Sequence, residues 1–210
     1  DVVRLGAGLI ATMSALVLGL LIASAKSTYD TQSTQVKQIT ANLILLDNLL
    51  RQYGPETEPI RKDLRTALPA FADKLWSERR DHNRQEHFEA LAGTERIYSA
   101  MQGLSPKNDV QKALQTRLIQ IANDIAQARM MLFVSSGDKI PIPFLTILIF
   151  WLTIIFASFT MFTDLNKTVS TYLALFAFAA SCGIFLILEL SHPFTGIMTI
   201  SSEPLRNALA

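Results

Sequence analysis

The sequence predicts an all-α membrane protein with at least three transmembrane helices and a four-helix soluble domain inserted between the first and the second. Three observations support this fold class. Half of the 210 residues are hydrophobic and only 18% are charged, with a mean hydropathy of +0.27. This balance is too apolar for an ordinary soluble domain. Three apolar runs are long enough to cross a bilayer, and a polar segment with helical periodicity separates the first two.

The first predicted element is one long helix from Leu5 to Tyr53. It is apolar for about 21 residues, which at about 1.5 Å per residue crosses a hydrocarbon layer about 30 Å thick. We therefore assign residues 1–25 to the first transmembrane helix. Beyond Lys26 the apolar residues recur every three or four positions, so one stripe is expected to face a partner helix in water. The residues of this stripe are Val36, Ile39, Leu43, Leu46 and Leu50. Gly54 is expected to end the helix.

Residues 26–139 are predicted to form a soluble domain of four helices, of which the end of the long helix is the first. The second helix carries an apolar face and a proline that is expected to kink it: Ile60, Leu64, Ala67 or Leu68, Phe71 and Leu75, with Pro69. The third repeats the pattern through Phe88, Leu91, Tyr98 and Met101. Ser105 before Pro106 predicts the start of the fourth helix. The apolar side of this helix is expected to comprise Val110, Leu114, Ile121, Ile125 and Leu132.

Two further transmembrane helices are predicted over residues 140–162 and 170–190. The polar residues 163–169 between them suit a tight hairpin. Residues 191–210 form a C-terminal tail that begins where Pro193 stops the last helix. The chain begins with Asp rather than Met, so a further transmembrane helix is one segment that could precede it.

The distribution of basic residues predicts which side of the membrane the insert occupies. With three spans, most lysines and arginines near the span ends fall on the side of the insert, and the positive-inside rule places that side in the cytoplasm. The protein is therefore expected to be a multi-pass protein of the inner, or plasma, membrane.

The first transmembrane helix has small residues at steps of three or four: Gly8, Thr12, Ala15, Gly19 and Ala23. Such a face lets membrane helices approach closely. One interpretation is that copies of this helix pack around an axis, with Met13, Leu16 and Leu20 facing inward. The other is ordinary packing against helices of the same chain.

Residue patterns typical of enzymes, metal sites and nucleic-acid sites are missing from the sequence. His82 and His87 are five residues apart, a spacing that does not place two ligands on one helix face. Cys182 is the only cysteine, and the net charge of +1 argues against nucleic-acid binding. We therefore expect no catalytic residues, no metal site and no cofactor.

Glu189 lies at the end of the last predicted span, about one turn before Pro193. An ionisable group at this depth is a candidate functional residue. The alternative is a carboxylate that reaches the water of the headgroup region.

Three segments carry a resemblance to a known family: DVVRLGAGLIATMSALVLGLLIASAKSTYDTQ, LLDNLLRQYGPE, and HPFTG with SSEPL near the C-terminus. They resemble the bacterial bestrophin-like membrane family, over nearly the whole chain, and this family is similar to the bestrophin anion channels. Tyr29 and Asp30 resemble the Tyr-Asp-like motif of those channels. Pro193, Phe194 and Gly196 resemble their Pro-Phe-Gly segment, with Thr195 inserted.

The resemblance implies a homopentamer with a neck of apolar side chains spaced by four along the first helix. The matching residues here are Thr12, Leu16 and Leu20, with Met13 as a neighbouring candidate. The acidic calcium clasp and the aromatic neck residues of animal bestrophins have no counterpart in this sequence. We therefore expect a homo-oligomeric channel for small anions without calcium gating. The alternatives are a membrane receptor and an accessory or structural membrane subunit without transport.

Overall fold

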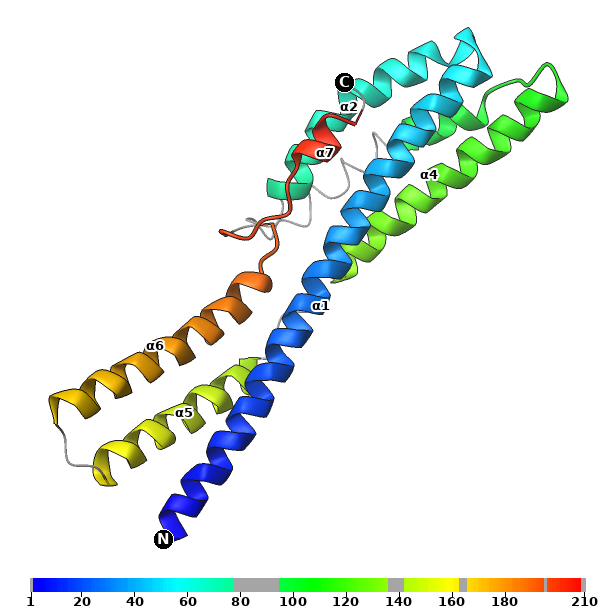
Figure 1. The fold of residues 1–210 in the computed structure, drawn as a ribbon. Coiled ribbons are helices and arrows are strands. Elements are labelled where there is room, and N and C mark those ends of the chain that lie inside the picture. The colour runs from blue at the N-terminus through cyan, green and yellow to red at the C-terminus, as the bar shows by residue number, and fades with distance from the viewer. Residues whose placement is uncertain (1, 78–94, 136–141, 163–165, 195, 209–210) are drawn as a thin grey trace. The chain divides into compact units, whose positions relative to one another are not determined.

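The computed structural model describes residues 2–77, 95–135, 142–162, 166–194 and 196–208. Every regular element in these ranges is a helix, and they contain no strand. The chain forms two compact units. The first comprises Asp1–Thr31 and Gly137–Met198, and the second comprises Gln32–Ser136 and Thr199–Ala210. The all-helical fold class is confirmed for the part of the chain that the structure describes (Figure 1).

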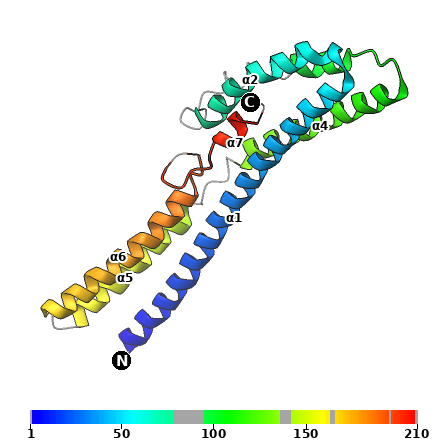
Figure 2. The same ribbon diagram turned by 45° about the horizontal axis from the view of Figure 1, so that its top comes forward.

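The first unit is built from three helices, each long and apolar enough to cross a membrane. They are the first part of α1 (Val2–Tyr53), α5 (Ile142–Phe162) and α6 (Lys167–Leu190). α5 and α6 run in opposite directions as a hairpin (Figures 1 and 2). The third span begins earlier than predicted, because Lys167, Thr168 and Val169 belong to α6 instead of the connection. Residues 163–165 of that connection lie outside the described residues.

One apolar cluster joins the three helices of the first unit. Leu21 of α1, Leu148 of α5 and Ile187 of α6 form its buried centre. Gly183 lets α6 approach α1 closely, because a Cβ at this position would lie 3.3 Å from Leu18 Cδ2. Small residues allow membrane helices to pack by van der Waals contact in this way.

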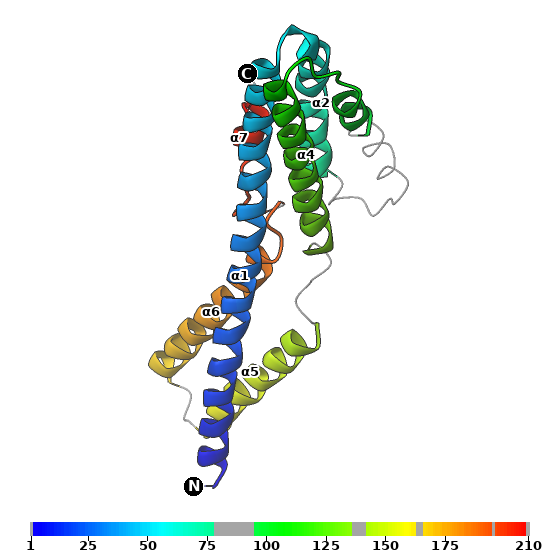
Figure 3. The same cartoon turned by 90° about the vertical axis from the view of Figure 1, so that its right-hand side faces the viewer.

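The second unit contains the rest of α1, the short 3₁₀ helix η1 (Pro55–Thr57), α2 (Glu58–Ser77), α4 (Asp109–Ser135) and α7 (Glu203–Arg206). Residues 95–102 are also helical. α4 runs beside α1 (Figure 3), and Gln111 Nε2 of α4 donates a hydrogen bond to the Tyr53 carbonyl of α1 at 2.9 Å. The four-helix bundle stays a prediction, since Phe88 and Leu91 of its third helix lie outside the described residues.

The end of α1 agrees with the sequence analysis. Gly54 has φ +138°, a region that L side chains rarely adopt. The Thr57 backbone N–H donates to the Gly54 carbonyl at 3.2 Å. The fully buried Thr57 hydroxyl lies 2.5 Å from the Leu50 carbonyl and 2.8 Å from that of Gly54. The last carbonyl groups of a helix have no backbone partner within the helix. At the end of α1, the Thr57 side chain provides such a partner.

The apolar stripes of α1 and α2 are largely as predicted. All five α1 positions are buried, and so are Ile60, Leu64 and Leu68 of α2. Leu68 rather than Ala67 takes the core position, and Ala72 is also buried. Pro69 lies inside α2, and the side chains of Phe71 and Leu75 lie outside the described residues.

Two predictions for α4 are wrong. The helix begins at Asp109, and its cap is Asn108, whose side-chain oxygen accepts from the Gln111 N–H at 2.8 Å. Ser105 and Pro106 precede the helix, because asparagine three residues later provides the same capping chemistry. Val110 is 69% exposed, whereas Leu118, which the sequence analysis did not select, is fully buried.

A charged clasp joins α2 to α1. Arg61 donates from Nε and Nη2 to the two carboxylate oxygens of Asp47 at 2.9 and 3.1 Å, and both side chains are mostly buried. Arg65 reaches the same carboxylate at 3.5 Å. The hydrogen bonds from Arg61 hold the pKa of Asp47 below its ordinary value of 3.8.

We expect Asp47→Asn to destabilise the second unit by about 1.5–3 kcal/mol at neutral pH, because it removes charge-assisted hydrogen bonds. Since the pKa of Asp47 is lowered in the folded state, its contribution is complete above pH 3.8 and is lost as the pH falls through the folded pKa. Thermal unfolding of the wild type and the variant from pH 7 to pH 3 measures this. A difference in midpoint that stays constant down to pH 3 contradicts the prediction.

The C-terminal segment lies along α2 (Figure 1). Trp76 Nε1 donates to the Ile200 carbonyl at 2.9 Å, and Arg206 pairs with Asp73. Leu205 of α7 is fully buried. Residues 199–208 are therefore part of the folded second unit.

Candidate functional site

The part of α1 that belongs to the first unit, up to Thr31, has one packed face and one uncovered face. Ser14, Leu21 and Ala25 are 2–6% exposed and share one side of the helix, where Leu21 packs against Leu148 of α5 and Ile187 of α6. The Ser14 hydroxyl donates to the Ile10 carbonyl at 2.8 Å, so this buried polar group has a hydrogen-bond partner. The packed face alone accounts for the association of α1 with the other two spans.

The predicted neck residues all lie on the uncovered face. Leu16 is 74% exposed, Leu20 69% and Met13 44%. Thr12 is also exposed, and its hydroxyl donates to the Leu9 carbonyl of its own helix at 2.8 Å. Because this hydroxyl is satisfied locally, Thr12 adds little polarity to the surface. Leu5 and Leu9, at 75% and 64% exposed, extend the same apolar face.

Helical geometry places Leu16 at the centre of this face. At about 100° per residue, Thr12 lies about 40° to one side of Leu16 and Leu20 about 40° to the other, while Met13 is about 60° away. We use the term neck face for these four residues. Leu21 and Ala25 lie about 140–180° from Leu16, so the neck face is directed away from α5 and α6.

The small residues of the first span flank the neck face on one side. Within this chain, a Cβ placed on Gly8 or Gly19 would have no atom within 4 Å, and Ala15 and Ala23 are exposed. Within the described residues, these small residues therefore do not pack against α5 or α6. Gly183 on α6, not the small residues of α1, provides the close approach.

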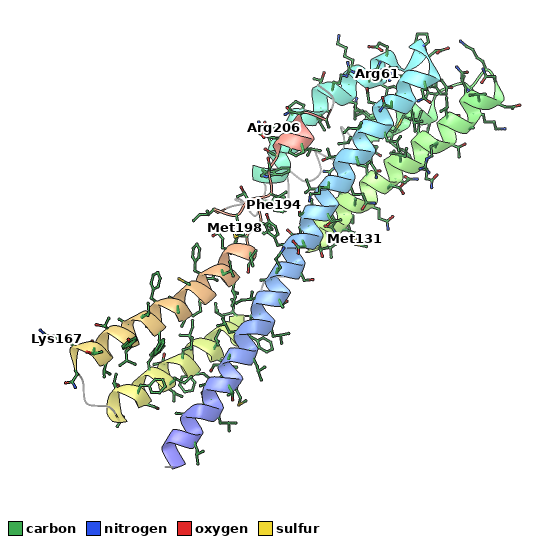
Figure 4. The ribbon with its side chains drawn as sticks, in the orientation of Figure 1. Arg61, Met131, Lys167, Phe194, Met198 and Arg206 are labelled. Carbon is green, nitrogen blue, oxygen red and sulfur yellow. The ribbon has the colours of Figure 1, made fainter. Side chains whose placement is uncertain are left out.

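The residues predicted after the last span form a second, separate feature. Glu189 and Gly196 are brought together, since the Glu189 carboxylate accepts hydrogen bonds from the Ile197 N–H and, at 2.8 Å, from the Met198 N–H. Gly196 has φ +131° and leaves no room for a Cβ against Glu189. Pro193 and Phe194 are buried (Figure 4 labels Phe194 and Met198). Glu189 thus organises the loop that follows α6.

We expect Glu189→Ala to speed hydrogen exchange of the Ile197 and Met198 amides by about five- to thirtyfold, because hydrogen bonds to a charged acceptor contribute about 1–2 kcal/mol or more. Glu189→Gln keeps one acceptor oxygen and is expected to show a smaller effect. Gly196→Ala is expected to open the same loop, because the positive φ disfavours alanine. Gly103→Ala is the matched control. Unchanged exchange in Glu189→Ala contradicts this role.

The sequence analysis missed one ion pair at the end of the apolar segment. Lys26 Nζ lies 2.5 and 2.7 Å from the two carboxylate oxygens of Asp30, and 5.8 Å from the centre of the Tyr29 ring. Opposite charges four residues apart on a helix are the signal that predicts such a pair.

The described residues contain no group of three or more histidine, cysteine, aspartate or glutamate side chains that could hold a metal ion. His82 and His87 lie outside the described residues. Cys182 is a free, exposed thiol on α6.

One of three comparisons with known proteins finds a match. The family model for the bestrophin-like domain matches residues 1–205. Neither the curated proteins nor the solved structures provide a match. The matched segment contains the three membrane-length helices, the neck face and the Glu189 loop. The chain is therefore a membrane protein that belongs to the bestrophin-like domain family.

Proposed function

We propose that this protein is a homo-oligomeric membrane channel for small anions, in which the neck faces of several copies of α1 surround a central pathway. A pentamer is the assembly that the family resemblance suggests. Thr12, Met13, Leu16 and Leu20 would form the narrow, apolar part of the pathway. Such a constriction can gate by dewetting, without a charged group.

The observation that carries this proposal is the division of α1 into two faces. Its inner face is covered by α5 and α6, and its neck face is covered by none of the residues that the structure describes. Here leucines lie beside a row of glycine and alanine that would let a second copy of α1 approach closely.

The choice of anions rests on the family resemblance. From Leu5 to Ala25 the helix contains no charged residue, and the first charged groups after this segment are the paired Lys26 and Asp30. Anion selectivity would then arise outside the apolar segment, from basic side chains and helix termini at the mouth of the pathway. No metal or cofactor enters the proposal.

The assembly is tested by crosslinking between copies. In a Cys182→Ser background, a short bifunctional maleimide is expected to join copies of Ala23→Cys, which lies about 20° from Leu16 on the helix. Phe178→Cys on α6, 67% exposed, is the matched control and is expected to remain monomeric on denaturing gels. Monomeric particles in detergent, or efficient crosslinking only of the control, would overturn the proposed assembly.

Transport is tested with the purified protein in planar bilayers under a chloride gradient. Current carried by chloride supports the channel, and leak-level current across several anions opposes it. The topology is tested at Lys112→Cys in the Cys182→Ser background, since Lys112 is exposed on α4. Labelling by an impermeant maleimide only after permeabilisation supports a cytoplasmic insert. Labelling in intact spheroplasts favours the receptor alternative.

A further inference from the structure

The ion pair between Lys26 and Asp30 lies directly beyond the neck face on the same helix. Both side chains are more than half exposed, at 57% and 55%. Lys26 follows Leu20 by six residues, or about 9 Å along the helix axis. Between Leu5 and this pair, α1 carries no charge. The pair is therefore the charged feature of α1 that lies nearest to this end of the neck.

The helical register aligns Asp30 with the neck face. Asp30 follows Leu16 by fourteen residues, so it lies about 40° from Leu16 around the helix, with the exposed Ala23 halfway between them. Lys26 lies about 80° from Leu16, on the flank of the same face. If copies of α1 surround an axis at Leu16, the carboxylates of Asp30 are directed toward that axis and the ammonium groups of Lys26 stand beside them.

Tyr29 holds the ammonium group near the helix. The ring centre lies 5.8 Å from Lys26 Nζ, within the range of a cation–π contact. Tyr29 is partly buried and about 140° from Leu16, so the ring lies on the other side of Lys26 from the axis. Lys26 therefore keeps one partner when the carboxylate is neutralised.

We propose that the Lys26–Asp30 pair determines the charge selectivity of the pathway. This inference rests on the proposed channel. A ring of unpaired carboxylates at the mouth would attract cations and repel anions over a distance of about 8–10 Å at physiological ionic strength. With Lys26 bound to each carboxylate, the ring has no net charge, and its electric field decays faster with distance. The ring then does not repel anions, so Asp30 can line an anion pathway.

Neutralising each partner separately should shift selectivity in opposite directions. Asp30→Asn leaves a positive charge on every copy and is expected to raise the chloride-to-potassium permeability ratio by roughly fivefold or more. Lys26→Met leaves a negative charge and is expected to lower the ratio by a similar factor. The exchange Lys26→Asp with Asp30→Lys restores a neutral pair and is expected to return the ratio toward the wild-type value.

The experiment measures reversal potentials of the reconstituted full chain in a potassium chloride gradient. The matched control is the exposed pair of Glu56 and Lys107 in the second unit. Glu56→Gln and Lys107→Met are expected to leave the ratio unchanged. Each variant must elute as the wild type does in size-exclusion chromatography.

The outcomes separate this inference from the proposed function. Current with opposite shifts for Asp30→Asn and Lys26→Met supports the inference. Current with the wild-type permeability ratio in both variants overturns the inference but is compatible with the proposed channel function. Leak-level current from the wild type and from Leu16→Ala overturns both.

Discussion

Leu16→Ala is expected to raise the ionic current of the reconstituted protein by at least about tenfold. Leu16 is the centre of the neck face and is 74% exposed in the single chain. Apolar side chains that surround a narrow pathway exclude water, and removing them favours the wet, conducting state. The substitution removes three carbon atoms per copy, which corresponds to about 2 kcal/mol of apolar transfer free energy. A change of about 1.4 kcal/mol shifts an equilibrium tenfold, here the one between the dry and the conducting pathway. Every copy carries the substitution, so tenfold is a lower bound.

The control for this variant is Leu175→Ala on α6. Leu175 is 57% exposed but lies on a different helix, where lipid is the expected neighbour. Its current should equal that of the wild type. Leu20→Ala should act as Leu16→Ala does, since both belong to the neck face. Equal, leak-level current from all four proteins, measured with chloride and with other anions, would contradict the neck assignment.

Leu118→Ala is expected to have the largest effect on stability. Leu118 is fully buried in α4, so the exchange loses apolar burial and leaves a cavity, at a cost of about 2–5 kcal/mol. For a protein of this size the unfolding midpoint should fall by roughly 4–20 °C. Circular dichroism of the detergent-solubilised protein during heating measures the midpoint of helix loss.

Val110→Ala is the matched control in the same helix. Val110 is 69% exposed, and exposed substitutions usually change stability by no more than about 0.5 kcal/mol. Alanine also has the higher helix propensity. A midpoint for Val110→Ala that falls as far as that of Leu118→Ala would show that the core of the second unit includes Val110, as the sequence pattern alone suggested.

Features that depend on neighbouring residues in the chain were accurately predictable. The apolar length and the absence of glycine and proline from Leu20 to Tyr53 predict the continuous helix α1 and its end at Gly54. The α1 stripe from Val36 to Leu50 is buried at every predicted position, because a period of three to four residues leaves one choice of face. The family assignment also follows from sequence motifs and is confirmed over residues 1–205.

Local signals failed where several residues compete for one role. Ser105 and Asn108 both carry N-cap chemistry, and the helix starts at the second. Val110 fits the period of α4 but lies in its first turn and is exposed, whereas Leu118 fits the same period and is buried. Periodicity predicts which face of a helix is apolar. How far along the helix that face is covered depends on the partner helix.

The sequence by itself therefore determined the membrane class, the three apolar helices, the long first helix and the apolar character of Thr12, Met13, Leu16 and Leu20. Only the tertiary structure decided which side of α1 meets α5 and α6 and which side is left uncovered. It also decided that Glu189 accepts amides of the following loop and that Asp47 binds Arg61 across two helices. The physical reason is that helix length and polarity are set by local residues, whereas packing partners are chosen by contacts between segments distant in the chain.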